Sequence, residues 1–73
     1  SMALDKNIKI IFRADGDSHI GLGHIMRSLA LAAEFKKYNQ LTEILFIMAN
    51  TSIGINLVRK HGYPIKIDNN LLP

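Results

Sequence analysis

The sequence contains no cysteine among its 73 residues. A disulfide framework and a thiolate metal site are therefore excluded, and the absence fits a reducing cytosol. Long hydrophobic runs are also missing, because no stretch approaches the roughly 20 apolar residues that a membrane-spanning helix needs. No signal peptide is visible at the start. We therefore expect a cytoplasmic protein without a membrane partner.

Charge of one sign is not concentrated anywhere in the sequence. The net charge is +3, from nine basic and six acidic residues, and the basic residues are scattered. Nucleic-acid binders usually gather such charge on one face, and no zinc-finger spacing or aromatic RNA-binding motif is present. We therefore expect a solvated surface and no nucleic-acid partner.

The composition fits a small globular domain rather than a disordered tail, with 48% hydrophobic and 21% charged residues. A chain of about 60 residues buries only around 60% of the surface that its unfolded form exposes, so its stability is marginal without help. We assign residues 3–73 to one domain. Ser1 is expected to be a remnant of tag removal, and Met2 the natural start.

Apolar stretches alternate with helix-forming stretches along the chain. The stretch NIKIIF carries consecutive β-branched residues without alternation, which favours a strand covered on both faces. The stretch HIMRSLALAAEFKKY lacks glycine and proline and predicts a helix buried over most of its circumference. Thr51 or Ser52 can cap a second helix, which Gly62 would end. The expected strands are 7–12, 43–49 and 63–68, and the expected helices are 24–38 and about 52–61.

This β-α-β-α-β order predicts an α/β fold with a parallel, Rossmann-like sheet. If the three strands follow one another across the sheet, both right-handed crossovers place their helices on the same face. The opposite face is then bare although the strands are apolar, and a patch of that kind usually marks a missing partner. We therefore expect either the opening of a longer protein or association of copies through the bare face.

The stretch RADGDSHIGLGHIMR, residues 13–27, is the most distinctive part of the sequence. Gly16, Gly21 and Gly23 lie where the first strand passes to the first helix, and glycine lets a ligand approach the backbone closely. A helix amino end offers free N–H groups that suit phosphate, and ligands of α/β proteins bind at the carboxyl edge of the sheet. An anionic ligand is therefore expected here.

Two phosphate-binding motifs are absent from this stretch. The P-loop requires Gly-Lys followed by Ser or Thr, which does not occur. The dinucleotide fingerprint would begin at Gly21 and Gly23, but Met26 stands at its third glycine, and Ala49 and Asn50 replace the expected acidic residue. We expect no cofactor and no metal. The remaining interpretation is a loop that accepts a sugar diphosphate, with His24 as the reactive group.

The pattern R-A-D-G-x-x-x-I-G-x-G-H-x-x-R, from Arg13 to Arg27, resembles the amino-terminal signature of a bacterial polysaccharide-biosynthesis family. That family includes a spore coat polysaccharide protein and the UDP-sugar hydrolase of pseudaminic acid synthesis. More distantly, the Gly-x-Gly-His turn is similar to the loop of the glycosyltransferase that adds N-acetylglucosamine to the peptidoglycan lipid precursor. Residues 57–68 are similar to the next helix and strand of the family. The resemblance implies the amino-terminal part of a two-domain GT-B fold, whose carboxyl-terminal domain would hold most nucleotide contacts.

The resemblance also implies inverting hydrolysis of a UDP-amino sugar, with His24 as general base. Histidine can take a proton near neutral pH, and a helix amino end disfavours its charged form. The candidate ligand contacts implied by the resemblance are Ile20, Gly21, Leu22 and Gly23. For three charged residues, ligand contact and structural ion pairing both stay open: Arg13, Asp15 and Arg27, the last favoured as a structural pair.

Other histidines and alternative functions complete the expectations. His19 and His61 are expected to be structural or exposed, and Asp17 can form an Asx-turn. Glycosyl transfer to an acceptor hydroxyl is the alternative within enzymes. A non-catalytic binding module, or an inert fragment that associates with itself, is the alternative outside them. We expect the 73 residues to be inactive alone.

Overall fold

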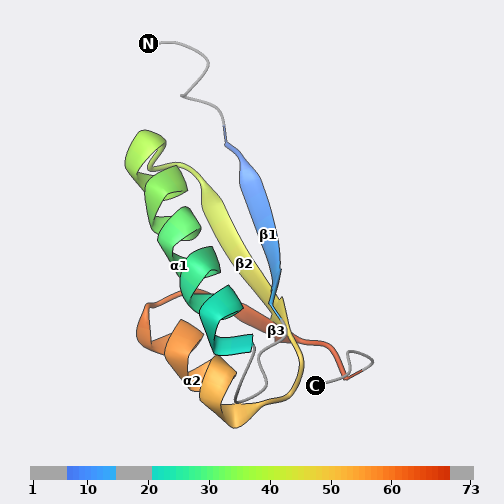
Figure 1. Ribbon diagram of the computed structural model, residues 1–73. Helices are drawn as coiled ribbons and strands as arrows, with labels where there is room; N and C mark the ends of the chain where they lie inside the picture. The colour runs from blue at the N-terminus through green and yellow to red at the C-terminus, as the bar shows by residue number, and fades with distance from the viewer. Residues whose placement is uncertain (1–6, 15–20, 70–73) are drawn as a thin grey trace.

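The structure, a computed structural model, describes residues 7–14 and 21–69. Strands and helices alternate along the chain, so the expected β-α-β-α-β order and α/β class are confirmed (Figure 1). The elements are β1 (Lys9–Ala14), α1 (Gly21–Tyr38), β2 (Glu43–Met48), α2 (Ser52–Lys60) and β3 (Ile65–Ile67). Within the described ranges, neither helix has the length and apolarity needed to cross a bilayer.

The three strands form one parallel sheet in the order β1-β2-β3. Lys9 is aligned with Glu43 at one end of the β1–β2 pair, and Ala14 with Met48 at the other. The shorter β3 pairs only with the second half of β2, where Met48 is aligned with Ile67. Because β2 lies in the middle, it carries the centre of the core.

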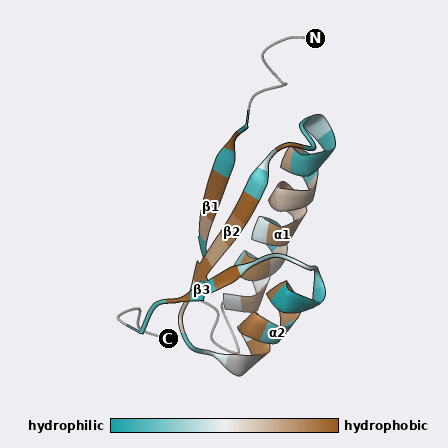
Figure 2. Cartoon of the chain, turned by 180° about the vertical axis from the view of Figure 1, so that it is seen from behind, coloured by the Kyte–Doolittle hydropathy of each residue, from teal (hydrophilic) through white to brown (hydrophobic). Residues whose placement is uncertain are grey.

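Both helices cover the same face of the sheet, as expected for two right-handed crossovers (Figures 1 and 2). Every second residue of β2 points toward the helices and is buried. The nine residues of the core cluster are Ala14, Ile25, Leu29, Ala32, Ile44, Phe46, Met48, Ile55 and Val58. The ring of Phe46 stacks on Phe12, with centroids 5.2 Å apart, and contacts Tyr63 on its other side. The core therefore extends from β1 to the loop before β3.

The opposite face of the sheet is bare. Ile11 of β1 is 50% exposed and is aligned with the half-buried Leu45 of β2. Two residues further along, Ile47 of β2 is aligned with Arg13 of β1 on one side and with Lys66 of β3 on the other. The strands are apolar along most of their length (Figure 2). Burial in β1 alternates, so the expectation that this strand is covered on both faces is wrong. The reason is that both crossovers have the same hand, which leaves the second face without a helix.

Two boundaries at the start of the fold differ from expectation. β1 covers 9–14 instead of 7–12, because its ladder with β2 continues to Ala14. α1 begins at Gly21 instead of residue 24, so Gly21 and Gly23 belong to its first turn and not to the preceding loop. The prediction that they form a ligand-binding loop is therefore wrong in its local structure.

α1 is also less buried than expected. Only one of its sides meets the sheet and α2, and large side chains elsewhere on it are exposed, among them Met26, Leu31, Phe35 and Tyr38. The prediction that this helix is buried over most of its circumference is therefore wrong, because the sheet and α2 together cover only one of its sides.

The ends of α2 follow expectation only in part. Gly62 has a φ of 84° and closes the helix, with its N–H donating to the carbonyl oxygen of Arg59 at 2.9 Å, as predicted. Thr51 occupies the N-cap position, but its side chain makes no cap hydrogen bond, so the predicted capping role fails for this residue. Its buried hydroxyl oxygen has no hydrogen-bond partner within the described part of the chain. β3 is three residues long instead of six, although the carbonyl of Pro64 still accepts a hydrogen bond from Phe46 N–H.

Candidate functional site

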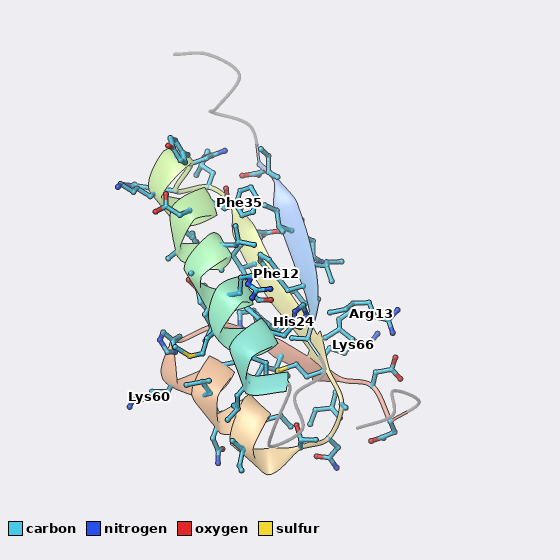
Figure 3. The ribbon with its side chains drawn as sticks, viewed as in Figure 1. Phe12, Arg13, His24, Phe35, Lys60 and Lys66 are labelled. Atoms are coloured by element: carbon cyan, nitrogen blue, oxygen red, sulfur yellow. The ribbon has the colours of Figure 1, made fainter. Side chains whose placement is uncertain are left out.

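His24 lies on α1 above the carboxyl end of β1 (Figure 3). Its side chain is exposed, and its Nε2 is 3.4 Å from the carbonyl oxygen of Arg13. A carbonyl oxygen can only accept, so this long contact favours the tautomer protonated on Nε2. Nδ1 then keeps its lone pair. The exposed ring thus presents the unprotonated Nδ1 at the carboxyl edge of the sheet.

The side chain of Arg13 points away from His24. Arg13 is aligned with Ile47 and, through it, with Lys66, and both cationic side chains point to the bare side of the sheet (Figure 3). The link between Arg13 and His24 is made by the main-chain carbonyl. Two exposed cations thus stand at the carboxyl end of the bare face, while the imidazole stands on the helix-covered side. The sequence reasoning did not single out Lys66, and the parallel register is the signal that places it beside Arg13.

Gly23 provides open space next to His24. A Cβ added at Gly23 would meet no atom of the described residues within 4 Å, so close packing against them does not explain the glycine there. Gly23 also lies in the first turn of α1, whose N–H groups have no acceptor within the helix. At Gly23, no side chain of residues 7–14 or 21–69 stands in the way of a phosphate or a sugar hydroxyl.

Leu22 faces elsewhere. It is half-buried and lines a shallow, largely apolar groove of about 440 Å³ between the start of α1 and the outer side of α2. The other lining residues are Ile53, Asn56, Leu57 and Lys60. Neither His24 nor Arg27 lines it. The expectation that Leu22 acts with His24 gains no support from this geometry.

The remaining candidates divide into placed and unplaced residues. Gly21 is buried, and Arg27 is exposed one turn after His24 on the same side of α1. Asp15 and Ile20 lie outside the described residues, as do Gly16, Asp17 and His19. The choice between ion pairing and ligand contact for Arg13 and Arg27 therefore stays a prediction.

His61 has a structural role at the end of α2. Its Nδ1 donates a hydrogen bond to the carbonyl oxygen of Leu57, at 2.9 Å. This contact ties the ring to the last turn of the helix, at some distance from the carboxyl edge of the sheet. Across residues 7–14 and 21–69, no group of three or more metal-ligating side chains that could hold an ion is found.

Gly54 is a structural residue that the sequence reasoning missed. An added Cβ there would lie 2.9 Å from Cδ1 of Ile25 and 3.2 Å from Cε of Met48. The glycine therefore lets α2 approach α1 and the end of β2 closely. A glycine within a predicted helix is the only signal that could have indicated this close approach.

Comparison with known proteins gives one similarity. The chain is 33% identical over 58 residues to the uncharacterized protein MJ1062 of Methanocaldococcus jannaschii, and this match covers 80% of the chain. The chain spans 12% of that protein, about an eighth of its length. No family model matches the sequence, and no solved structure matches it.

Proposed function

We propose that the chain is the amino-terminal part of a GT-B-type enzyme that hydrolyses a UDP-amino sugar, with inversion, in the bacterial cytoplasm. The observation that carries the proposal is the exposed ring of His24 at the carboxyl edge of a parallel sheet, beside the open first turn of α1. The signature resemblance from Arg13 to Arg27 supplies the substrate class. Such an enzyme would serve the synthesis of surface polysaccharide.

In the proposed reaction, Nδ1 of His24 takes a proton from a water molecule while Nε2–H faces the carbonyl of Arg13. The oxygen of that water attacks the anomeric carbon from the side opposite UDP. The bond from this carbon to the diphosphate oxygen breaks, and UDP leaves with the electron pair. The products are the free sugar of inverted configuration and UDP.

The first turn of α1 has a separate role in this proposal. Its free N–H groups and the partial positive charge of the helix amino end suit the diphosphate or the developing charge on it. Gly23 leaves room for that approach, since no side chain in the described part of the chain occupies the space beside it. Arg27, on the same side of α1, is the nearest charged residue along the helix that can contact the phosphates.

A second, nucleotide-binding domain is part of the proposal. Its support is the small share of the relative that the chain spans, 12%, together with the resemblance to a two-domain family. The 73 residues would then form one wall of a cleft. We therefore expect them to be inactive alone.

The proposal is tested by measuring UDP release from a UDP-amino sugar, without acceptor, by the longer protein that carries this chain. His24→Ala should lower the rate by about 10²-fold or more, the usual contribution of a general base. His61→Ala is the matched control and should leave the rate unchanged, because that ring follows α2 and bonds to the carbonyl oxygen of Leu57 in it. Release that persists in His24→Ala overturns the catalytic assignment. Release only with an acceptor indicates glycosyl transfer, and binding without turnover indicates a binding module.

A further inference from the structure

The start of α1 is held by contacts on two of its sides. On one side, Nε2 of His24 lies 3.4 Å from the carbonyl oxygen of Arg13 in β1. The next residue, Ile25, points about 100° away around the helix, is fully buried and reaches α2 at Gly54. In Figure 1, α2 lies beside the first turns of α1. The place of the imidazole is therefore set by β1 and by α2 together.

Gly54 leaves no spare room between α2 and Ile25. A Cβ added at Gly54 would lie 2.9 Å from Cδ1 of Ile25, whereas carbon atoms in contact prefer about 3.5–4.0 Å. The same Cβ would lie 3.2 Å from Cε of Met48 and 3.2 Å from Oγ1 of Thr51. An alanine at this position therefore requires a displacement of about 0.6 Å.

The surrounding core decides which atoms yield to such a Cβ. Ile25 and Met48 are fully buried within the core cluster, so another rotamer of either side chain would meet packed atoms. α2 is held against the sheet by the buried Ile55 and Val58. The first turns of α1 have an exposed side, around His24, toward which they can move. A displacement of α1 is therefore the expected response.

This contact lies inside the molecule and not on a free surface. Gly54 and Ile25 are both buried, and the atoms that would meet the added Cβ belong to α1, to β2 and to the residue before α2. Strands added at either edge of the sheet would leave the contact covered as it is. An inference from it therefore depends only on the described part of the chain.

We propose that Gly54 is a positioning residue for His24. By letting α2 approach Ile25 closely, it seats the first turns of α1 where Nε2 of His24 reaches the carbonyl of Arg13. The inference rests on the proposed function, in which this contact leaves Nδ1 as the base. The contact is longer than the usual hydrogen-bond range of about 2.7–3.2 Å. A displacement of about 0.6 Å is thus large enough to break it.

The nitrogen signals of the His24 ring, measured by nuclear magnetic resonance in the 73-residue chain, test the positioning without any reaction. In the unchanged chain at a pH where the ring is neutral, they should show the proton on Nε2. Gly54→Ala should move them toward a mixture of both tautomers, while circular dichroism verifies the fold. Asn56→Ala is the matched control, because Asn56 is exposed on the outer side of the same helix, and it should leave the signals unchanged.

Ile25→Val separates positioning from a general loss of stability. Valine lacks the Cδ1 methyl that the added Cβ would meet. Gly54→Ala combined with Ile25→Val should therefore show the ring signals of Ile25→Val alone, with the proton on Nε2. If Gly54→Ala alone does not fold, this double variant should still fold and show those signals. A double variant that does not fold would contradict the inference.

The rate of UDP release by the longer protein gives a second measurement. A misplacement of about 1 Å can cost about 10²-fold in rate, so Gly54→Ala should slow release about tenfold. Adding Ile25→Val should recover most of that loss. If the unchanged protein releases no UDP, the proposed function fails, and the ring signals still decide whether Gly54 positions His24.

Two results of the ring measurement would overturn the inference. One is unchanged His24 signals in a folded Gly54→Ala, which would show that the core side chains or α2 absorb the added methyl group. The other is a change that Ile25→Val does not reverse, which would show that the effect does not pass through this contact.

Discussion

At the scale of single residues, Gly23 and Gly62 separate two uses of glycine. At either position an added Cβ would meet no described atom within 4 Å, but only Gly62 has a positive φ among the described glycines. Gly62 is thus required by backbone conformation, which its place after a helix predicted. Gly23 has a helical backbone and open space where a Cβ would be, which fits a surface kept free for a ligand.

Gly62→Ala should destabilise the fold by about 1–2 kcal/mol, the cost of a left-handed conformation for a residue with a Cβ. Gly23→Ala is the matched control and should leave the free energy of unfolding unchanged or raise it, because alanine is the better helix former. Urea unfolding followed by circular dichroism measures both. A loss in Gly23→Ala equal to that in Gly62→Ala would contradict the assignment.

Thr51→Val should leave the stability unchanged or raise it by up to about 1 kcal/mol. The buried hydroxyl oxygen of Thr51 has no hydrogen-bond partner in the described part of the chain, so its replacement by a methyl group removes a desolvation cost. Thr51→Ser keeps the hydroxyl, loses the methyl group and should be less stable than Thr51→Val. The opposite order in thermal unfolding would show that the hydroxyl does cap α2.

At the scale of elements, the sequence predicts type and order better than boundaries. The strand β2 was predicted to within one residue, because its apolar run is bounded by polar residues on both sides. The start of α1 was missed because Gly21 and Gly23 indicate a loop by local propensity, whereas tertiary packing buries Gly21 in the helix. The short β3 depends on its pairing with β2, which its own six-residue pattern does not reveal.

Substitution of Phe46 tests the part of the core that β2 carries. Its side chain is fully buried on β2 and contacts the rings of Phe12 and Tyr63. Phe46→Ala should cost about 3–5 kcal/mol. The free energy of unfolding of a domain of this size is typically roughly 4–11 kcal/mol in total. The melting temperature should therefore fall steeply, or the cooperative transition should disappear. Phe35→Ala, at a 42% exposed position, is the comparison and should cost much less; similar losses would contradict the described core.

At the scale of the whole molecule, the sequence predicts which face of the sheet the helices cover, but it does not predict where the side chains at the carboxyl edge point. The sequence order alone placed both helices on one face, as the structure shows (Figure 1). It did not reveal that Arg13 points away from His24, because that depends on the strand register and on where β1 ends.

The central claim is that the exposed imidazole of His24 and the open first turn of α1 meet an activated sugar. We expect nuclear magnetic resonance titration of the 73-residue chain with a UDP-amino sugar to test this most directly. The ring signals of His24 and the amides of residues 22–24 should shift and saturate at millimolar ligand, while the ring of His61 serves as the internal control. No change at His24, or equal changes at His61, would contradict the account.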